Sequence, residues 1–243
     1  YLENKYGPDA KVMVLPKGVG WFVPNFSFMR AQVERYSFVA KSNLDRPVLG
    51  ELCSFQEPSS IFSITYGKGS KIVDMLRYVM GDEAFGKMMK RYFKEYQFKN
   101  ISVNDLERLS SEEARQDLSW FFDEWLNTIK KCDYAVKDVK SNKVTLANNG
   151  DIVMPVKVRV GLENGKERDF DWDGKDKEKE FQAGKGDRIK YVQVDPDKRI
   201  LDMELVNNNW RRKVDFVPVP LYYPVYELPV FLKDDAYSLV AGP

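Results

Sequence analysis

The sequence predicts an α+β fold in which an N-terminal helical bundle precedes a small antiparallel β-sandwich and an extended tail. Three observations support this. Apolar residues recur at helical spacing through roughly the first half, the apolar period becomes two after Cys132, and prolines and tyrosines accumulate near the end. We therefore divide the chain into a helical part over residues 1–131, a sandwich over 132–206 and a tail over 207–243.

The helical part is defined by stripes of apolar residues along single helix faces. The clearest stripe falls on positions i, i+3, i+4, i+7, i+8 and i+11 and consists of Phe85, Met88, Met89, Tyr92, Phe93 and Tyr96. Gly81 and Asp82 separate this helix from the preceding one, since glycine ends helices and aspartate caps them. Ser102 and Asp105 have the spacing of a capping box. We expect the aromatic stripes, with Trp120 and Trp125, to form core.

The second half shows the alternation of half-buried strands. Met154, Val156, Val158 and Val160 alternate with polar or proline positions, and pairs such as Asn164-Gly165 and Asp173-Gly174 supply turns at sandwich spacing. In the tail the prolines are Pro218, Pro220, Pro224, Pro229 and Pro243. Because proline removes a ladder donor, the tail is expected to be an extended strap or edge segment. The alternative is the approach to a membrane-associated or barrel region of an exported or membrane-associated parent protein.

Composition excludes several classes of function. The 243 residues carry Lys+Arg 38 against Asp+Glu 37, a net charge of +1, which gives no general attraction to nucleic acid or anionic lipid. The absence of histidine excludes a histidine-based triad or an H-E-x-x-H metal helix within these residues. Cys53 and Cys132 form no metal-spaced cluster and leave the redox compartment open. We thus expect no metal or cofactor site within this chain, and no apolar run is long enough to span a bilayer as a helix.

The segment 63–85 begins with a glycine-rich stretch around Lys68 that is not a phosphate loop. A Walker sequence would need glycine where Phe62 stands and a hydroxyl residue where Gly69 stands. A dinucleotide fingerprint would need its third glycine at Ile72. The remaining interpretation is a helix start, with Lys68 as a solvated side chain there.

The same segment carries a family resemblance. Its residues Ile64–Gly69 and Gly81–Phe85, with Asp45–Val48 upstream and Asp117–Leu126 downstream, resemble the gluzincin zinc aminopeptidases of the membrane alanyl aminopeptidase family. The sandwich region resembles the β domain of that family, so the resemblance extends from residue 1 to about residue 206.

The resemblance implies a catalytic role for Tyr66. In the family, the tyrosine of the [ST]-Y-x-K-G segment donates its phenolic O–H to the oxyanion of the tetrahedral intermediate. A phenol with a pKa of about 10 keeps its proton at neutral pH and is suited to that task. Without the resemblance, a tyrosine at such a position is more often a packing residue.

The resemblance also implies that the zinc ligands and the general-base glutamate lie outside this chain. Tyr1-Leu2-Glu3 is similar to the end of the family segment that holds the last ligand, so the missing N-terminal part of the same protein is expected to supply the zinc site. The expected function is then that of a fragment of a zinc-dependent aminopeptidase-like metallopeptidase. It would be inactive alone, with zinc and a peptide substrate bound only in the parent.

Two alternatives stay open. The parent could be a non-catalytic scaffold, derived from a peptidase, that uses bundle and sandwich to bind proteins. A sandwich that binds partners, joined to unrelated helices, is the more distant alternative.

Overall fold

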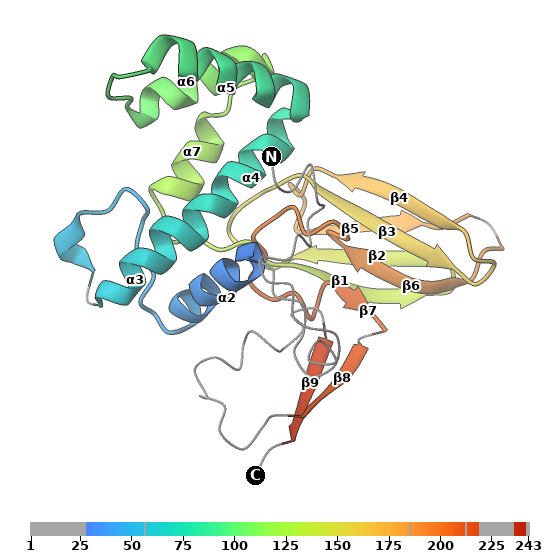
Figure 1. The fold of residues 1–243 in the computed structure, drawn as a ribbon. Helices are drawn as coiled ribbons and strands as arrows, with labels where there is room; N and C mark the ends of the chain where they lie inside the picture. Colours follow the sequence, from blue (N-terminus) through green and yellow to red (C-terminus); the bar gives the residue numbers. More distant parts are fainter. Residues whose placement is uncertain (1–27, 56, 185, 212, 219–235, 242–243) are drawn as a thin grey trace, which may run out of the picture.

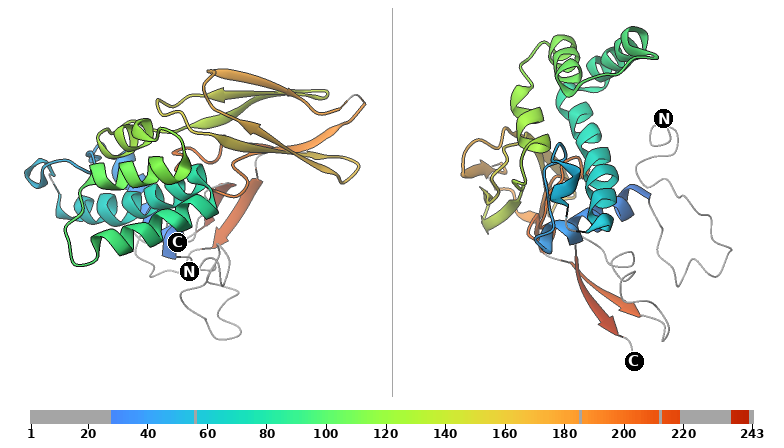
Figure 2. Two further views of the ribbon diagram at one scale, coloured as in Figure 1. Left: turned by 90° about the horizontal axis from the view of Figure 1, so that it is seen from above. Right: turned by 90° about the vertical axis from the view of Figure 1, so that its left-hand side faces the viewer.

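The computed structural model describes residues 28–55, 57–184, 186–211, 213–218 and 236–241. Helices fill the first part of the chain, and the second part contains two antiparallel sheets and one parallel strand pair, which confirms the α+β prediction (Figure 1). The helical part and the two main sheets lie side by side (Figure 2). Within the described part of the chain, no helix combines the length and the apolar character needed to cross a membrane.

The helical part contains six α-helices, a short 3₁₀ turn and one π-helical turn, counted over the described residues. The α-helices are α2 (Phe28–Lys41), α3 (Pro58–Phe62), α4 (Gly69–Met80), α5 (Asp82–Tyr96), α6 (Val103–Ala114) and α7 (Ser119–Leu126). The 3₁₀ turn η2 covers Leu52–Ser54, and the π turn η3 covers Ser63–Lys68.

The predicted helix boundaries around Gly81 and Ser102 are confirmed. Gly81 has φ +79°, a left-handed conformation that favours glycine, and α5 begins at the next residue. At α6, the Ser102 hydroxyl accepts from the Asp105 backbone N–H, and the Asp105 carboxylate accepts from the Ser102 N–H, which completes the capping box. Trp125 is buried as expected, but Trp120 is 36% exposed, because it follows Leu118 by two positions and falls outside the inward face of α7.

Two antiparallel sheets form the sandwich. One has the order β1-β2-β5, from β1 (Tyr134–Lys140), β2 (Lys143–Asn148) and β5 (Glu178–Gln182). The other has the order β4-β3-β6-β7, from β3 (Val156–Leu162), β4 (Glu167–Trp172), β6 (Ile189–Val194) and β7 (Asn209–Trp210). The alternation at Val156, Val158 and Val160 is confirmed, since all three face the core and are at most 1% exposed.

The predicted tail contains the last paired strands. β7 lies within it and pairs with β6, while β8 (Lys213–Pro218) and β9 (Ala236–Ala241) pair with each other in parallel. Residues 219–235, which hold Pro220, Pro224 and Pro229, lie outside the described residues, and so does any region that follows the tail.

A single hydrophobic cluster runs from the helices into the sandwich. It joins Leu76 and Trp125 of the helical part to Val158 and Val192 of the second sheet. Two methionine sulfurs lie at the junction: Met154 Sδ accepts the Trp125 indole N–H at 3.4 Å, and Met75 Sδ accepts the Leu201 N–H at 3.2 Å. The two parts are therefore held by one continuous core.

Polar contacts fix the same junction. Lys71 Nζ on α4 donates to the Lys198 carbonyl at 2.7 Å and to Asp74 Oδ2 at 2.6 Å. The buried Asp195 carboxylate accepts the backbone N–H groups of Arg199 and Ile200, at 2.8 and 2.9 Å. The loop after β6 is thus closed by its own aspartate and tied to α4.

Tyr134 and Met154 form a reciprocal pair inside the sandwich. The Tyr134 hydroxyl donates to the Met154 carbonyl at 2.8 Å and accepts from the Met154 N–H at 2.9 Å. Both residues are fully buried, so the phenol satisfies two backbone groups that water does not reach.

Tyr134→Phe is therefore expected to lower the free energy of unfolding by roughly 1–3 kcal/mol, because it leaves two buried backbone groups unpaired. Urea denaturation measures the change. Tyr191→Phe is the matched control: its hydroxyl bonds Glu167 at the surface, and its loss should cost less than about 0.5 kcal/mol. Equal effects of the two substitutions would contradict the assignment.

Asp202 is a buried carboxylate at the bundle–sandwich junction. It is 3% exposed and accepts the backbone N–H groups of Tyr134 at 2.8 Å and Glu204 at 2.9 Å. Burial raises the pKa of Asp202 to about 7, although these two hydrogen bonds favour the ionised form. There is therefore a pH range over which Asp202 is protonated in the folded protein and ionised in the unfolded chain.

The raised pKa of Asp202 determines how the stability of the protein changes with pH. The stability contributed by protonated Asp202 is fully present below the unfolded-state pKa of 3.8 and is lost as the pH rises to about 7. Relative to Asp202→Asn, the wild type is expected to lose about 4 kcal/mol of unfolding free energy over that range. Denaturation of the wild type and of Asp202→Asn at pH 4 to 8 measures the difference, and a difference that does not change with pH would contradict this expectation.

Candidate functional site

Tyr66 lies in the π turn η3, inside one uninterrupted helix that runs from Pro58 to Met80. The expectation that the glycine-rich stretch starts a helix is therefore wrong. The helix starts at Pro58, eight positions before Tyr66. Proline is tolerated there because the backbone N–H groups of the first helical turn have no partner within the helix. Gly67 and Gly69 do not end it, because tertiary packing of η3 against α2 outweighs their weak helix propensity. Single π turns inside α-helices occur frequently at functional sites.

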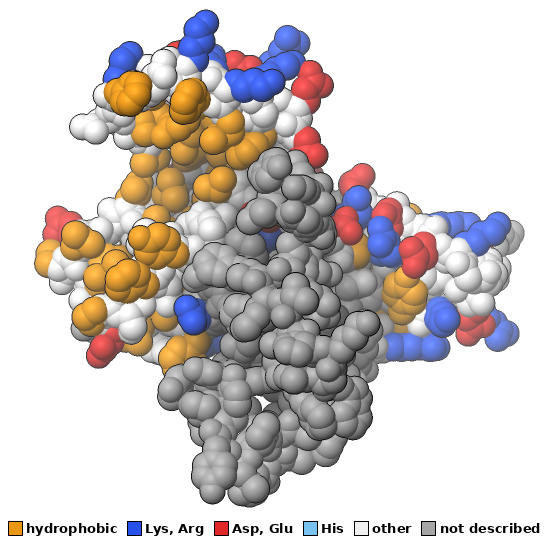
Figure 3. Space-filling model, viewed as in Figure 1, with side chains coloured by type: hydrophobic (Ala, Val, Ile, Leu, Met, Phe, Trp, Pro, Cys, Tyr) orange, Lys and Arg blue, Asp and Glu red, His pale blue; other side chains and the backbone are white. Residues whose placement is uncertain are grey.

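The Tyr66 side chain projects from the outer face of η3. It is 59% exposed and stacks on Phe62, with ring centroids 6.0 Å apart and an interplanar angle of 13°. Phe62 is 63% exposed, so the pair forms an apolar platform at the surface. No hydrogen bond from a described residue occupies the Tyr66 hydroxyl, which leaves it available to an incoming acceptor. Exposed apolar side chains gather over the helical part of the chain (Figure 3).

Lys68 is buried, which overturns the expectation of a solvated side chain. It is 0% exposed, and its Nζ donates to the Thr128 carbonyl just beyond α7 at 3.3 Å. The ammonium also lies 5.5 Å from the centroid of the Tyr36 ring on α2. Burial lowers the pKa of Lys68, Lys131 acts in the same direction, and the Asp45 carboxylate opposes both.

Asp45, Tyr36 and Lys68 form a buried polar cluster, in which Asp45 is the acidic group. It is 4% exposed, its Oδ2 accepts the Tyr36 hydroxyl at 2.9 Å, and its Oδ1 has no hydrogen-bond partner. Burial and the Asp45 carboxylate raise the pKa of the Tyr36 phenol, which therefore stays protonated. Arg46 fixes the same loop through hydrogen bonds to the carbonyls of Asp45 at 2.6 Å and Ser54 at 3.2 Å.

Sequence reasoning missed this cluster although the spacing contained a signal. Lys68 stands four positions after Ile64 and four before Ile72, and both isoleucines face the core. A lysine on an apolar stripe predicts either burial or a stem that extends to solvent. Only the tertiary structure distinguishes these, through the positions of Tyr36, Asp45 and Thr128.

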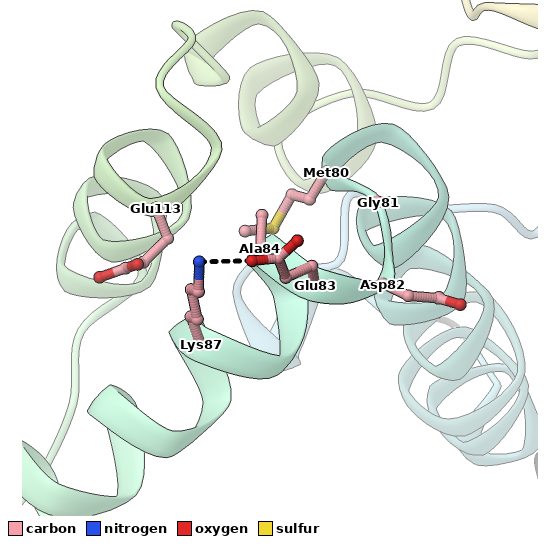
Figure 4. Close-up of a pocket in the computed structure, with 7 residues that line it drawn as sticks. All are labelled: Met80, Gly81, Asp82, Glu83, Ala84, Lys87 and Glu113. Atoms are coloured by element: carbon pink, nitrogen blue, oxygen red, sulfur yellow. Dashed lines mark hydrogen bonds and ion pairs between the residues drawn. The ribbon is translucent and has the colours of Figure 1, made fainter.

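The described residues do not provide a metal centre. No group of three or more potential ligands among them could hold an ion. One shallow hollow, of about 380 Å³, lies at the Gly81 turn, at the end of α4 remote from Tyr66. The Glu83–Lys87 ion pair, 2.6 Å long, lines it, and the Glu113 carboxylate is directed away from that pair (Figure 4). The hollow brings no nucleophile or acid–base pair to Tyr66.

Comparison with known proteins shows similarity to one peptidase family. Residues 22–125 match the peptidase family M1 domain. The chain is 45% identical over 64 residues to aminopeptidase N of Lactococcus lactis subsp. lactis, a match that covers 26% of this chain and 8% of that protein. It is 33% identical over 95 residues to aminopeptidase M1-D of Oryza sativa subsp. japonica, covering 39% of this chain and 10% of that protein.

A solved structure gives a further, more distant likeness. The crystal structure of Legionella pneumophila aminopeptidase A in complex with aspartic acid superposes with a TM-score of 0.44 at 18% identity, covering 62% of this chain and 19% of that one. The family match includes the helix that carries Tyr66, and it continues through α5 and α6 into α7. Residues 22–125 of this chain are therefore similar to the peptidase family M1 domain, which supports the resemblance to gluzincin aminopeptidases.

Proposed function

We propose that this chain is part of a zinc-dependent aminopeptidase in which Tyr66 supplies the hydrogen bond to the reaction's oxyanion. The observation that supports the proposal is the exposed Tyr66 side chain, with a hydroxyl unused by the described residues, on a continuous helix within the segment that matches the M1 domain. The substrate class is a peptide with a free N-terminus, as the aminopeptidase relatives suggest.

The role requires a donor that keeps its proton and adopts one position. Hydrolysis of a peptide bond develops negative charge on the carbonyl oxygen, and a preorganised O–H stabilises that charge more in the transition state than in the ground state. A tyrosine on a helix is placed more accurately than one on a loop. The stack with Phe62 further restricts the ring.

The residues of this chain do not fit a zinc site. The sequence contains no histidine, and the described residues hold no cluster of three ligands. The aligned segments span only 8–10% of the two aminopeptidase relatives. The proposal therefore requires the metal ligands and the general base to come from sequence outside these 243 residues.

A non-catalytic scaffold is the second candidate, favoured by one observation. Several large apolar side chains are exposed on the helical part, including Phe62, Phe93 at 67% and Phe98. Exposed apolar groups of this kind are typical of surfaces that bind other proteins. Such a parent would hold no metal and would not hydrolyse peptides.

The test is made on the full-length protein with its metal-bearing segment. Zinc content and hydrolysis of an aminoacyl anilide are measured for the wild type and Tyr66→Phe. We expect one zinc per chain, and a kcat about 10²–10³-fold lower in the variant, because one oxyanion donor is lost. Zinc content should be unchanged by the substitution.

Tyr92→Phe is the matched control, since Tyr92 lies on α5 and stacks on Tyr96, away from η3. Its activity should equal that of the wild type. A zinc-loaded enzyme whose Tyr66→Phe variant keeps full activity would contradict the role of Tyr66. A parent without zinc and without activity would favour the scaffold.

A further inference from the structure

The π turn η3 is held from its inner side by one buried lysine. Lys68 connects three segments that are distant in sequence: Tyr36 on α2, Asp45 in the following loop, and the Thr128 carbonyl beyond α7. The inner face of η3 also contains Ile64 and Gly67, both buried. These three groups belong to different parts of the helical bundle.

The charge on Lys68 is only partly compensated. Its hydrogen bond to Thr128 is long at 3.3 Å, and the contact with the Tyr36 ring is a cation–π interaction. The Asp45 carboxylate attracts the ammonium without a direct ion pair between the described atoms, and its Oδ1 stays without a hydrogen-bond partner. Replacing such buried charges with apolar groups of similar volume is often neutral or stabilising. Stability alone therefore does not account for a lysine in this position.

Geometry links this lysine to Tyr66. Residues two positions apart on a helix face nearly opposite directions, so Lys68 points inward where Tyr66 points outward. A π turn is an uncommon conformation that needs support from its surroundings. A side chain that fixes the inner face of the turn also fixes the direction of the side chain on its outer face.

We infer that Lys68 is the positioning residue for Tyr66: its ammonium, held between Tyr36, Asp45 and Thr128, keeps η3 in the π conformation that directs the Tyr66 hydroxyl outward. The effect of Lys68 on the conformation of η3 does not depend on what the protein does. The effect of Lys68 on catalysis rests on the function proposed above.

The first test is amide hydrogen exchange of residues 63–69 in full-length protein. Lys68→Met keeps the length of the side chain and removes the charge. We expect exchange in this segment to rise about tenfold or more, because a buried charged hydrogen bond is lost. Lys71→Met is the matched control: Lys71 is the other buried lysine of this helix, 8% exposed, and it contacts Asp74 and Lys198 at the sandwich side. It should leave exchange at 63–69 unchanged.

The second test is kinetic. If Tyr66 is displaced, Lys68→Met should lower kcat about tenfold or more with KM unchanged, since small misplacements of catalytic groups are costly. Lys71→Met should leave both constants unchanged. Faster exchange with an unchanged kcat would support the positioning of η3 and count against the proposed role of Tyr66. Unchanged exchange at 63–69 in Lys68→Met would overturn the inference, whatever the activity.

Asp45→Asn keeps the test decisive if Lys68→Met does not fold. Asparagine still accepts the Tyr36 hydroxyl but removes the negative charge opposite Lys68. We expect this variant to raise exchange at 63–69 as well. In the double variant Lys68→Met/Asp45→Asn, exchange at 63–69 should rise by less than the sum of the two single-variant effects on the free energy of opening, because the two charges act together. Wild-type exchange in Asp45→Asn would contradict the inference.

Discussion

The fold depends on one long helix, residues 58–80, that packs against a different element along each part of its length. Its first half packs η3 against α2, and its second half places Met75 and Lys71 against the loop that follows β6. Within η3, Ile64, Gly67 and Lys68 are buried, whereas Tyr66 is exposed. The surface position of Tyr66 is therefore set by contacts on the opposite side of the helix.

The sandwich supports this helix as well as forming its own core. Asp195 and Asp202 close the segment between β6 and β7 by accepting backbone N–H groups. That segment then supplies the Lys198 carbonyl and the Leu201 N–H to α4. Buried carboxylates are costly, and the raised pKa of Asp202 is the direct sign of that cost. Their hydrogen bonds give the loop a single conformation at the junction.

The helical part places polar groups inside and apolar groups outside around η3, contrary to the usual distribution. Lys68 and Asp45 are enclosed, while Tyr66 and Phe62 are exposed. Departures of this kind are expected at functional sites, where local rules are broken and compensated elsewhere. These four residues all lie within residues 22–125, the segment that matches the peptidase family M1 domain.

The sequence by itself determined the α+β class, the helix boundary at Gly81, the capping box at Ser102 and the alternation of β3, because each depends on local periodicity or local backbone geometry. The motifs around Tyr66 also carried the M1 relationship. Only the tertiary structure decided that Lys68 is buried, that the glycine-rich stretch lies within a longer helix, and that Trp120 is partly exposed. Those outcomes depend on α2, the loop at Asp45 and the end of α7, which are distant in sequence and meet at η3 only when the chain is folded.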